Sequence, residues 1–271
     1  MASHTRSNSF PSRAHPIIEE ANEQLCRLRS SAATTTSSSS ISHKLSGLQD
    51  LHECVERLLQ LPLNQQATAQ KKHQKCTNEL LDGSLRLLDV CSTAKEALLQ
   101  TKACLQDLQS IIRRRGCESG VLTSEVRKYL TSRKMVKKTI QKAMVNTRST
   151  FSSLNKETEC ISIVNTLRNV EAITLSVFES LFSFISGPKA STSWSLVSKM
   201  MQSKRVACEE EAEINEFTEV DAALKSVKSA DNVQNQLNNL ESCIQDQEEG
   251  LECLFRQLIK TRVSLLNILN H

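Results

Sequence analysis

The sequence predicts an all-α fold: an elongated bundle of long helices with a disordered N-terminal tail. Three observations support this prediction. The 271 residues include only six Gly and four Pro, although the many turns of a β-rich fold need such residues. Apolar side chains recur at helical spacing over long stretches of the chain. The hydrophobic fraction of 39% and the charged fraction of 24% are typical of a globular protein.

Residues 1–42 are predicted to form a tail with a short helix and a Ser/Thr linker, ahead of a helical domain over 43–271. The short helix is expected from about Ile17 to Arg29. The tract from Ser30 to Ser42 is made almost entirely of Ser, Thr and Ala and has no apolar periodicity. Because such a tract buries too little apolar surface to offset its ordering entropy, it is interpreted as a flexible linker.

The folded region is expected to begin near His43, with a first helix that Pro62 ends. A long helix is expected from about Ala67 to Arg115, and it carries a heptad-type seam of apolar residues. The seam consists of Leu87, Cys91, Ala94, Leu98, Thr101, Leu105, Leu108 and Ile112.

Two more helices are expected from about Thr123 to Phe151 and from about Lys156 to Ser186. The following GPKASTS segment, residues 187–193, is a loop and a candidate internal domain boundary. A short helix is then expected around Trp194 to Arg205, before an acidic stretch.

The C-terminal helix carries the longest seam. Its 36 residues would form a rod of about 54 Å, which other helices must cover. We expect helices of the same chain to cover it, and a homo-oligomer is the alternative. The seam consists of Val233, Leu237, Leu240, Ile244, Gln247, Leu251, Leu254, Leu258, Thr261, Leu265 and Ile268.

The sequence contains no known catalytic motif. The ten cysteines are all at least ten residues apart, so they match no zinc site and are interpreted as reduced thiols. No nucleophile elbow, phosphate-binding loop or metalloprotease motif occurs. We therefore predict a protein that is not an enzyme, with no catalytic residues, no cofactor and no metal site.

Charge is segregated along the chain. Residues 102–148 contain twelve basic and three acidic side chains, whereas residues 208–252 contain two basic and thirteen acidic side chains. A helix wheel of 123–151 places apolar residues on one face and most basic residues on the other, but Arg133 and Lys137 fall on the apolar side. The predicted basic face comprises Arg113, Arg114, Arg115, Arg127, Lys128, Arg133, Lys134, Lys137, Lys138 and Lys142.

This basic region has three interpretations: a solvated outer face, a surface paired with the acidic stretch of the same chain, or a binding site for an external partner. The external partner would be an acidic protein or an anionic membrane surface. Nucleic acid is the weakest candidate, because aromatic residues for base stacking are scarce and the acidic stretch would repel phosphates.

The tail contains a short motif, Arg6-Ser7-Asn8-Ser9-Phe10-Pro11. It resembles the phosphoserine peptides that 14-3-3 proteins bind, with Arg6 three residues before Ser9 and Pro11 two residues after it. Phosphorylation of Ser9 would add about −1.5 to −2 charge, which an arginine cluster on a reader can bind. The motif predicts a phospho-dependent, 14-3-3-type partner.

The chain shows no secretory signal and no apolar segment of transmembrane length. We expect a cytoplasmic protein, with peripheral membrane association as the alternative. Residues 1–16 are rich in Ser and Arg and free of acidic residues, so the composition leaves an organelle transit peptide open.

Successive blocks of the sequence resemble a land-plant family known as domain of unknown function 241 and grouped with the BYPASS-like proteins. His52 stands where an aromatic residue is expected, and Ser92 where Gly is expected. The blocks span nearly the whole chain: RSNSFPSRAHP, GLQDLHECVERLLQLPLNQQA, ELLDGSLRLLDVCSTAKEALLQTK, DLQSIIRRRG, YLTSRKMVKK and WSLVSKMM.

The resemblance implies a mainly helical plant protein with no established enzymatic activity, and a role in root and shoot development. It implies no catalytic or metal-binding residue. We therefore predict an interaction or regulatory protein, with the alternative of a peripheral membrane protein that binds anionic lipid through its basic helix.

Overall fold

The structure is a computed structural model that describes seven ranges of the chain. These ranges are residues 15–31, 37–70, 73–115, 119–154, 162–187, 215–226 and 230–270. Within them the chain forms eight helices and no strand, so the predicted all-α fold is confirmed. The helices are α1 (Pro16–Ser31), α2 (Ser38–Leu59), α3 (Pro62–Ala69), α4 (Gln74–Arg115), α5 (Ser119–Leu154), α6 (Ser162–Ser186), α8 (Glu216–Ser226) and α9 (Ala230–Asn270).

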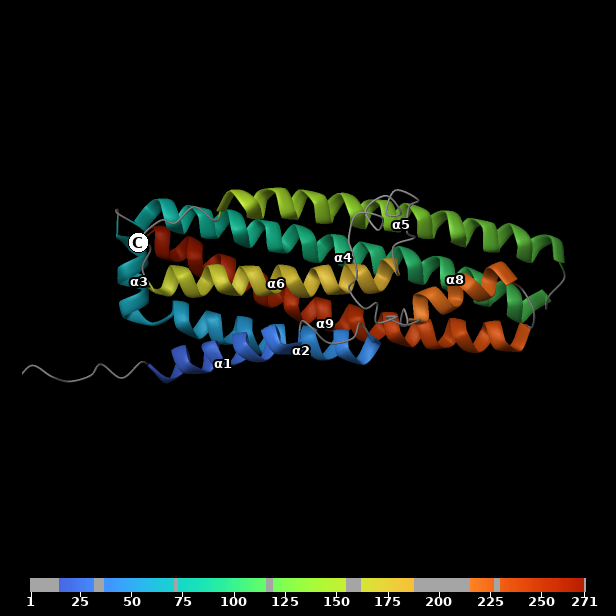
Figure 1. Ribbon diagram of the computed structural model, residues 1–271, viewed down its shortest axis with the longest axis horizontal. Helices are drawn as coiled ribbons and strands as arrows, with labels where there is room; N and C mark the ends of the chain where they lie inside the picture. Colours follow the sequence, from blue (N-terminus) through green and yellow to red (C-terminus); the bar gives the residue numbers. More distant parts are fainter. Residues whose placement is uncertain are drawn as a thin grey trace, which may run out of the picture.

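The bundle is elongated, with its long helices side by side (Figure 1). Helices α4 and α9 are the longest, at 42 and 41 residues, which corresponds to rods of about 60 Å. They run antiparallel, because Arg262 donates to Ser84 at one end of the pair and Gln109 donates to Asn238 at the other.

The remaining helices cover the α4–α9 pair. Helix α5 packs along α4, α6 packs on both α4 and α2, and α2 packs along α9. Helix α1 packs on α2, and α8 packs on α9 and α6. The short α3 lies at the end of the bundle where the last turns of α9 are found (Figure 1).

Both predicted seams are buried within this single chain. Every seam residue of α9 is buried, and on α4 only Ile112 remains partly exposed. Two of the three polar seam residues have partners inside their own helices: Thr101 donates to the Ala97 carbonyl oxygen, and Gln247 donates to Cys243 Sγ. Helices of the same chain therefore cover the seams.

The prediction that residues up to Ser42 form a linker, with the folded region beginning at His43, is wrong. Helix α2 begins at Ser38, because the Ser37 hydroxyl caps it by accepting from the Ser40 backbone N–H. Ile41 is fully buried, and the Ser38 hydroxyl donates to Cys243 on α9. Helix α1 also belongs to the bundle, because its Ala21, Leu25 and Leu28 join the same core.

The prediction of one helix from Ala67 to Arg115 is also wrong at its start. Pro62 occupies the first turn of α3, where its missing N–H costs nothing, so it starts a helix rather than only ending one. Helix α3 ends at Ala69 because Gln70 is extended, with φ −61° and ψ 133°. Helix α4 begins only at Gln74.

The candidate domain boundary at 187–193 does not separate two cores. Gly187 ends α6, and the rest of this loop, like the expected helix at 194–205, lies outside the described residues. On the far side of the loop, Phe217 of α8 packs edge-on against Phe184 of α6, with ring centroids 5.4 Å apart. The helices before and after the loop therefore share one core.

Candidate functional site

Helix α5 is amphipathic, and its apolar side is buried against the bundle. Leu122, Val126, Tyr129, Val136 and Ile140 are all buried, as their helical spacing predicts. Burial raises the pKa of the Tyr129 hydroxyl, so this side chain is neutral. The apolar side of α5 is therefore used for folding.

Arg133 and Lys137, the two basic residues on the apolar side, meet an acidic residue of α8. Arg133 Nε lies 3.2 Å from Asp221 Oδ1, and Lys137 Nζ lies 3.0 Å from Asp221 Oδ2. Arg133 also donates from Nη2 to the Ile185 carbonyl oxygen at 2.6 Å, and its guanidinium lies 4.9 Å from the Phe217 ring centroid. One carboxylate thus pairs with both basic residues on this side of α5 and offsets one of their two positive charges.

Other parts of the acidic stretch pair with α4. Lys102 Nζ donates to Glu248 Oε2 at 2.6 Å, and Lys95 pairs with Glu252. Hydrogen bonds from Gln106, and secondarily from Gln109, lower the pKa of Glu241. The interpretation of internal pairing is therefore correct for Lys102, Arg133 and Lys137.

The opposite side of α5 is exposed and basic. Arg127, Lys128, Lys134, Lys138 and Lys142 all face solvent, as the helix wheel predicts. Lys128 pairs with Glu125 of the same helix at 2.6 Å. The other four have no ion pair with any described residue, and we call these four, Arg127, Lys134, Lys138 and Lys142, the α5 basic face.

The remaining residues of the predicted basic region lie at the end of α4. Arg113 and Arg114 are exposed, and Arg114 donates to the Ser110 hydroxyl one turn earlier. The side chain of Arg115 is outside the described part of the structure. The tail motif with Arg6, Ser7, Ser9 and Pro11 is outside it as well.

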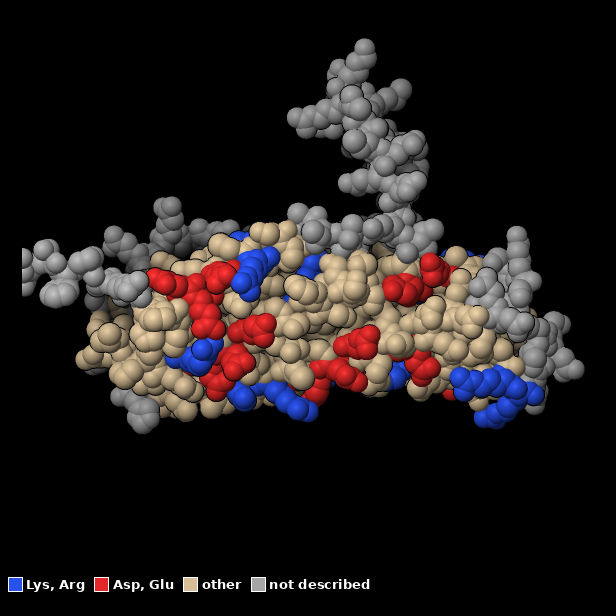
Figure 2. All heavy atoms as spheres, turned by 90° about the horizontal axis from the view of Figure 1, so that it is seen from below, with Lys and Arg blue, Asp and Glu red and all other residues tan. Residues whose placement is uncertain are grey.

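The side of the bundle opposite α5 has a different charge pattern. Figure 2 shows this side, where acidic groups are spread along the length of the molecule with basic groups between them. Several of these charges pair locally, for example Arg57 with Glu20 and Arg27 with Glu23, both at 2.6 Å. Such exposed pairs contribute little stability, typically below about 1 kcal/mol.

His52, which stands where the family resemblance leads us to expect an aromatic residue, lies on α2. Its ring is buried, and Nε2 lies 3.0 Å from the Thr174 hydroxyl of α6. Burial lowers the pKa of His52 to about 4, so the ring is neutral at physiological pH. His52 therefore acts as a hydrogen-bonding core residue between α2 and α6.

The described ranges contain no group of three or more His, Cys, Asp or Glu side chains placed to hold a metal ion. None of their helices combines the length and the hydrophobicity needed to cross a bilayer.

Asp221 is the functional partner that the sequence does not single out. The segregated charge indicates that Arg133 and Lys137 need acids, but thirteen acidic residues in 208–252 could serve. Asp221 is placed by the way α8 begins. The Asn215 side chain accepts from the Thr218 backbone N–H and donates to the Phe184 carbonyl oxygen. The second of these hydrogen bonds fixes the start of α8 against the end of α6.

Comparisons with known proteins identify the family. A protein-family model described as Protein BPS1 matches residues 44–268, which is most of the chain. Comparisons with curated proteins and with solved structures found no match. The matching family is the one that the sequence blocks resemble, so the resemblance is confirmed. The chain belongs to the BPS1 family of plant BYPASS-like proteins, and this membership implies a protein related to plant development.

Proposed function

We propose that this protein is a non-enzymatic regulator of root and shoot development, and that its α5 basic face binds an acidic partner protein. The observation that supports this proposal is the set of four exposed cations that have no ion pair with a described residue, whereas Arg133 and Lys137 pair with Asp221. From Arg127 to Lys142 they extend over about 22 Å of helix, a length suited to an acidic segment of another protein.

An acidic protein fits this surface better than a membrane does. A helix that inserts into a bilayer interface buries its apolar side in lipid, but the apolar side of α5 is already buried in the bundle. Only electrostatic attraction is left, at about 1 kcal/mol for each basic residue near an anionic membrane.

Peripheral membrane binding is the second candidate, and two exposed apolar residues favour it. Met135 is 54% exposed and Val145 is 61% exposed, and both lie on the solvent-facing side of α5 with the lysines. These two side chains would add a small apolar contact to the electrostatic attraction.

The proposal of a regulator without catalysis is supported by the structural contacts that the buried titratable side chains make. His52 is held in the core by Thr174, and Arg133 and Asp221 hold α5 to α8.

We further propose a cytoplasmic location, which the free thiols of the seven described cysteines favour. A fluorescent fusion protein in plant cells tests that location.

The test of the proposed function reverses the charge of the α5 basic face. The variant carries Lys134→Glu, Lys138→Glu and Lys142→Glu, all at exposed positions. The matched control carries Arg29→Glu, Lys75→Glu and Lys260→Glu, which change the net charge equally at exposed positions on α1, α4 and α9. Circular dichroism should show equal helicity for both variants and the unmodified protein.

Plants that lack the protein are then transformed with each form. We expect the control to restore root and shoot growth and the α5 variant to fail. Full restoration by the α5 variant would show that this face is not required. Co-sedimentation with vesicles of phosphatidylserine and phosphatidylcholine identifies the second candidate: binding that salt weakens and the α5 variant loses would favour the membrane.

A further inference from the structure

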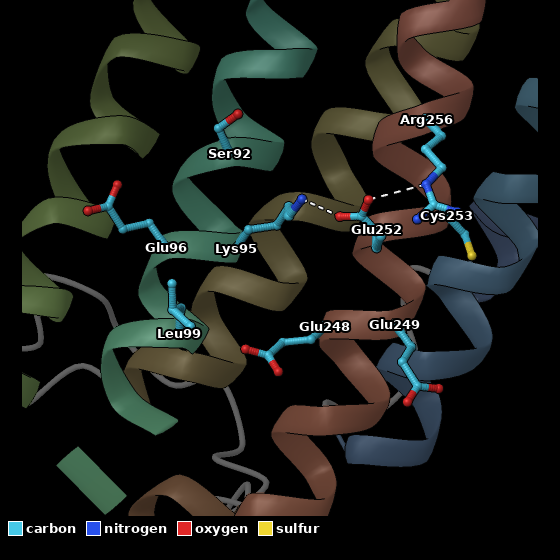
Figure 3. Close-up of a pocket in the computed structure, with 9 residues that line it drawn as sticks. All are labelled: Ser92, Lys95, Glu96, Leu99, Glu248, Glu249, Glu252, Cys253 and Arg256. Carbon is cyan, nitrogen blue, oxygen red and sulfur yellow. Dashed lines mark hydrogen bonds and ion pairs between the residues drawn. The ribbon is translucent and has the colours of Figure 1, made fainter. Parts of the chain in front are cut away.

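A groove runs between α4 and α9 on the outside of the bundle, and no described helix covers it. Figure 3 shows the two helices side by side, with Lys95 of α4 reaching across to Glu252 of α9. The open part of the groove has a volume of about 760 Å³. In the same view α5 lies on the other flank of α4, so the groove is separate from the α5 basic face.

Beside this groove, towards the end of α9, the exposed side of the α4–α9 pair is apolar on both helices. On α9, Ile259, Val263 and Leu266 are 41%, 47% and 38% exposed. Their spacing of four and three residues places them along one side of the helix. They are additional to the buried seam of α9, so this helix has a second apolar stripe that faces solvent.

A matching stripe lies on α4. Leu81, Leu85 and Leu88 have the same spacing of four and three residues, and Leu85 is 46% exposed. Arg262 donates to the Leu81 carbonyl oxygen at 2.6 Å. This contact brings the two stripes to the same level of the antiparallel pair.

The groove itself forms the acidic end of this surface. Its lining contains four acidic residues, Glu96, Glu248, Glu249 and Glu252, and two basic residues, Lys95 and Arg256. Glu248 and Glu252 pair with lysines of α4. Glu96 and Glu249 are exposed and have no ion pair with a described residue, so two negative charges remain for a partner.

We propose that this groove binds an amphipathic helix of a partner protein, with an apolar stripe of about two turns followed by Lys or Arg residues. The apolar stripe would pack between Leu85 and Val263, and the basic end would lie over Glu96 and Glu249. From Leu266 to Glu249 the apolar stripe and the groove together extend over about 25 Å of α9, which corresponds to a helix of about 17 residues. The proposal does not depend on the α5 basic face.

Charge favours this occupant over a second copy or a membrane. Two copies that join groove to groove about an axis along the helices would bring Glu96 and Glu249 against the same residues of the other copy. An axis across the helices would set the apolar end of each copy against the acidic end of the other. Anionic lipid would be repelled by the acidic end as well.

The experiment displays a library of 17-residue helical peptides on phage and selects it against the full-length protein. The probe that is then measured is the most enriched peptide, labelled with fluorescein. We expect the enriched peptides to share apolar residues at positions i, i+4 and i+7, with Lys or Arg beyond one end of that stripe. Selection without enrichment, or enriched peptides without this pattern, would overturn the proposal.

Variants of exposed groove residues locate the binding. We expect Val263→Lys to raise the dissociation constant at least tenfold. Glu249→Lys should raise it about fivefold at low salt and less at high salt. The control is Val145→Lys on α5, which lies on the other flank of α4; the native valine is 61% exposed, and the substitution should leave affinity unchanged. Equal affinity of the unmodified protein and Val263→Lys would overturn the proposal.

The same variants distinguish the other occupants. Sedimentation equilibrium would reveal a dimer if a second copy fills the groove, and dissociation of that dimer by Val263→Lys would overturn the proposal. Binding of phosphatidylserine vesicles that Val263→Lys abolishes would overturn it in favour of lipid. A monomeric protein whose vesicle binding is insensitive to Val263→Lys supports the proposal.

Discussion

Arg133 of α5 and Asp221 of α8 form a buried ion pair between residues 88 positions apart in the chain. The Arg133 side chain is only 2% exposed and the Asp221 side chain 10%. Arg133 also donates to the Ile185 carbonyl oxygen at the end of α6. A single guanidinium therefore joins three helices at one point of the bundle.

Replacing Arg133 should strongly destabilise the protein. In Arg133→Met the volume of the side chain is nearly preserved, but Asp221 loses its most buried partner. Removing one member of a buried pair costs about 3–5 kcal/mol, because the other charge stays buried without compensation. Since Lys137 still pairs with Asp221, we expect the lower end of this range in urea unfolding.

Lys137→Met is the matched control for that measurement. Its side chain is 39% exposed, so solvent screens its attraction to Asp221, and we expect a loss below about 1 kcal/mol. Equal losses for the two variants would contradict the assignment of Arg133 as the central residue of this cluster.

Protonation of His52 should make stability fall at acidic pH. Burial lowers the pKa of His52 in the folded protein from 6.5 to about 4, so below pH 6.5 the unfolded chain binds a proton that the folded chain does not. The stability that depends on neutral His52 is therefore fully present above pH 6.5 and is lost as the pH falls towards 4. Linkage gives a loss of about 3 kcal/mol over this range.

His52→Phe should remove this part of the pH dependence. Phenylalanine keeps an aromatic ring in the core, and the Thr174 hydroxyl keeps its bond to the Val170 carbonyl oxygen. The measurement is the free energy of unfolding at pH 7 and pH 4.5 for both proteins. Parallel pH profiles would show that other groups cause the acid sensitivity.

The cysteines should differ sharply in reactivity. Cys26 and Cys253 are exposed, whereas Cys91 and Cys243 are buried, and burial raises the pKa of each of these two thiols to about 12. Because the thiolate is the reactive form, iodoacetamide at pH 7.5 should modify Cys26 and Cys253 before Cys91 and Cys243. Peptide mass spectrometry with time should show Cys91 and Cys243 reacting only in urea. Modification of Cys91 as fast as Cys253 would contradict this packing.

Most of the fold could be predicted from the sequence because the helices are long and their apolar periodicity is strong. The seam of α9, from Val233 to Ile268, is buried at every predicted position. The errors lie at helix ends, where a capping side chain or the backbone conformation of one residue decides the outcome. Ser37 starts α2 inside a tract that looks like a linker, and Gln70 interrupts a stretch that looks helical.

The interaction surfaces could be predicted only in part. The helix wheel places Lys134, Lys138 and Lys142 on the exposed side of α5, and the structure agrees. The choice of Asp221 as a partner depends on how α8 lies against α6, which periodicity does not encode. The groove likewise depends on Leu85 and Val263, two residues far apart in sequence that only the antiparallel packing of α4 and α9 brings together.

Gly187 ends α6 in a conformation that favours glycine. Its φ is +73°, and its backbone N–H donates to the Ser183 carbonyl oxygen at 2.9 Å, which satisfies the end of the helix. A Cβ atom added there would also lie 2.5 Å from Thr218 Cγ2 of α8. Gly187→Ala therefore introduces both a strained backbone and a steric clash, and we expect a loss of about 2–3 kcal/mol in urea unfolding.

A second substitution separates the two causes. Thr218→Ser removes the methyl group that clashes and keeps the hydroxyl that accepts from the Asn215 backbone N–H. Gly187→Ala combined with Thr218→Ser should therefore recover the part of the loss that comes from the clash and retain about 1–2 kcal/mol from the left-handed backbone. Additive losses in this double-mutant cycle would show that Gly187 and Thr218 are not in contact, and that α8 lies elsewhere relative to the end of α6.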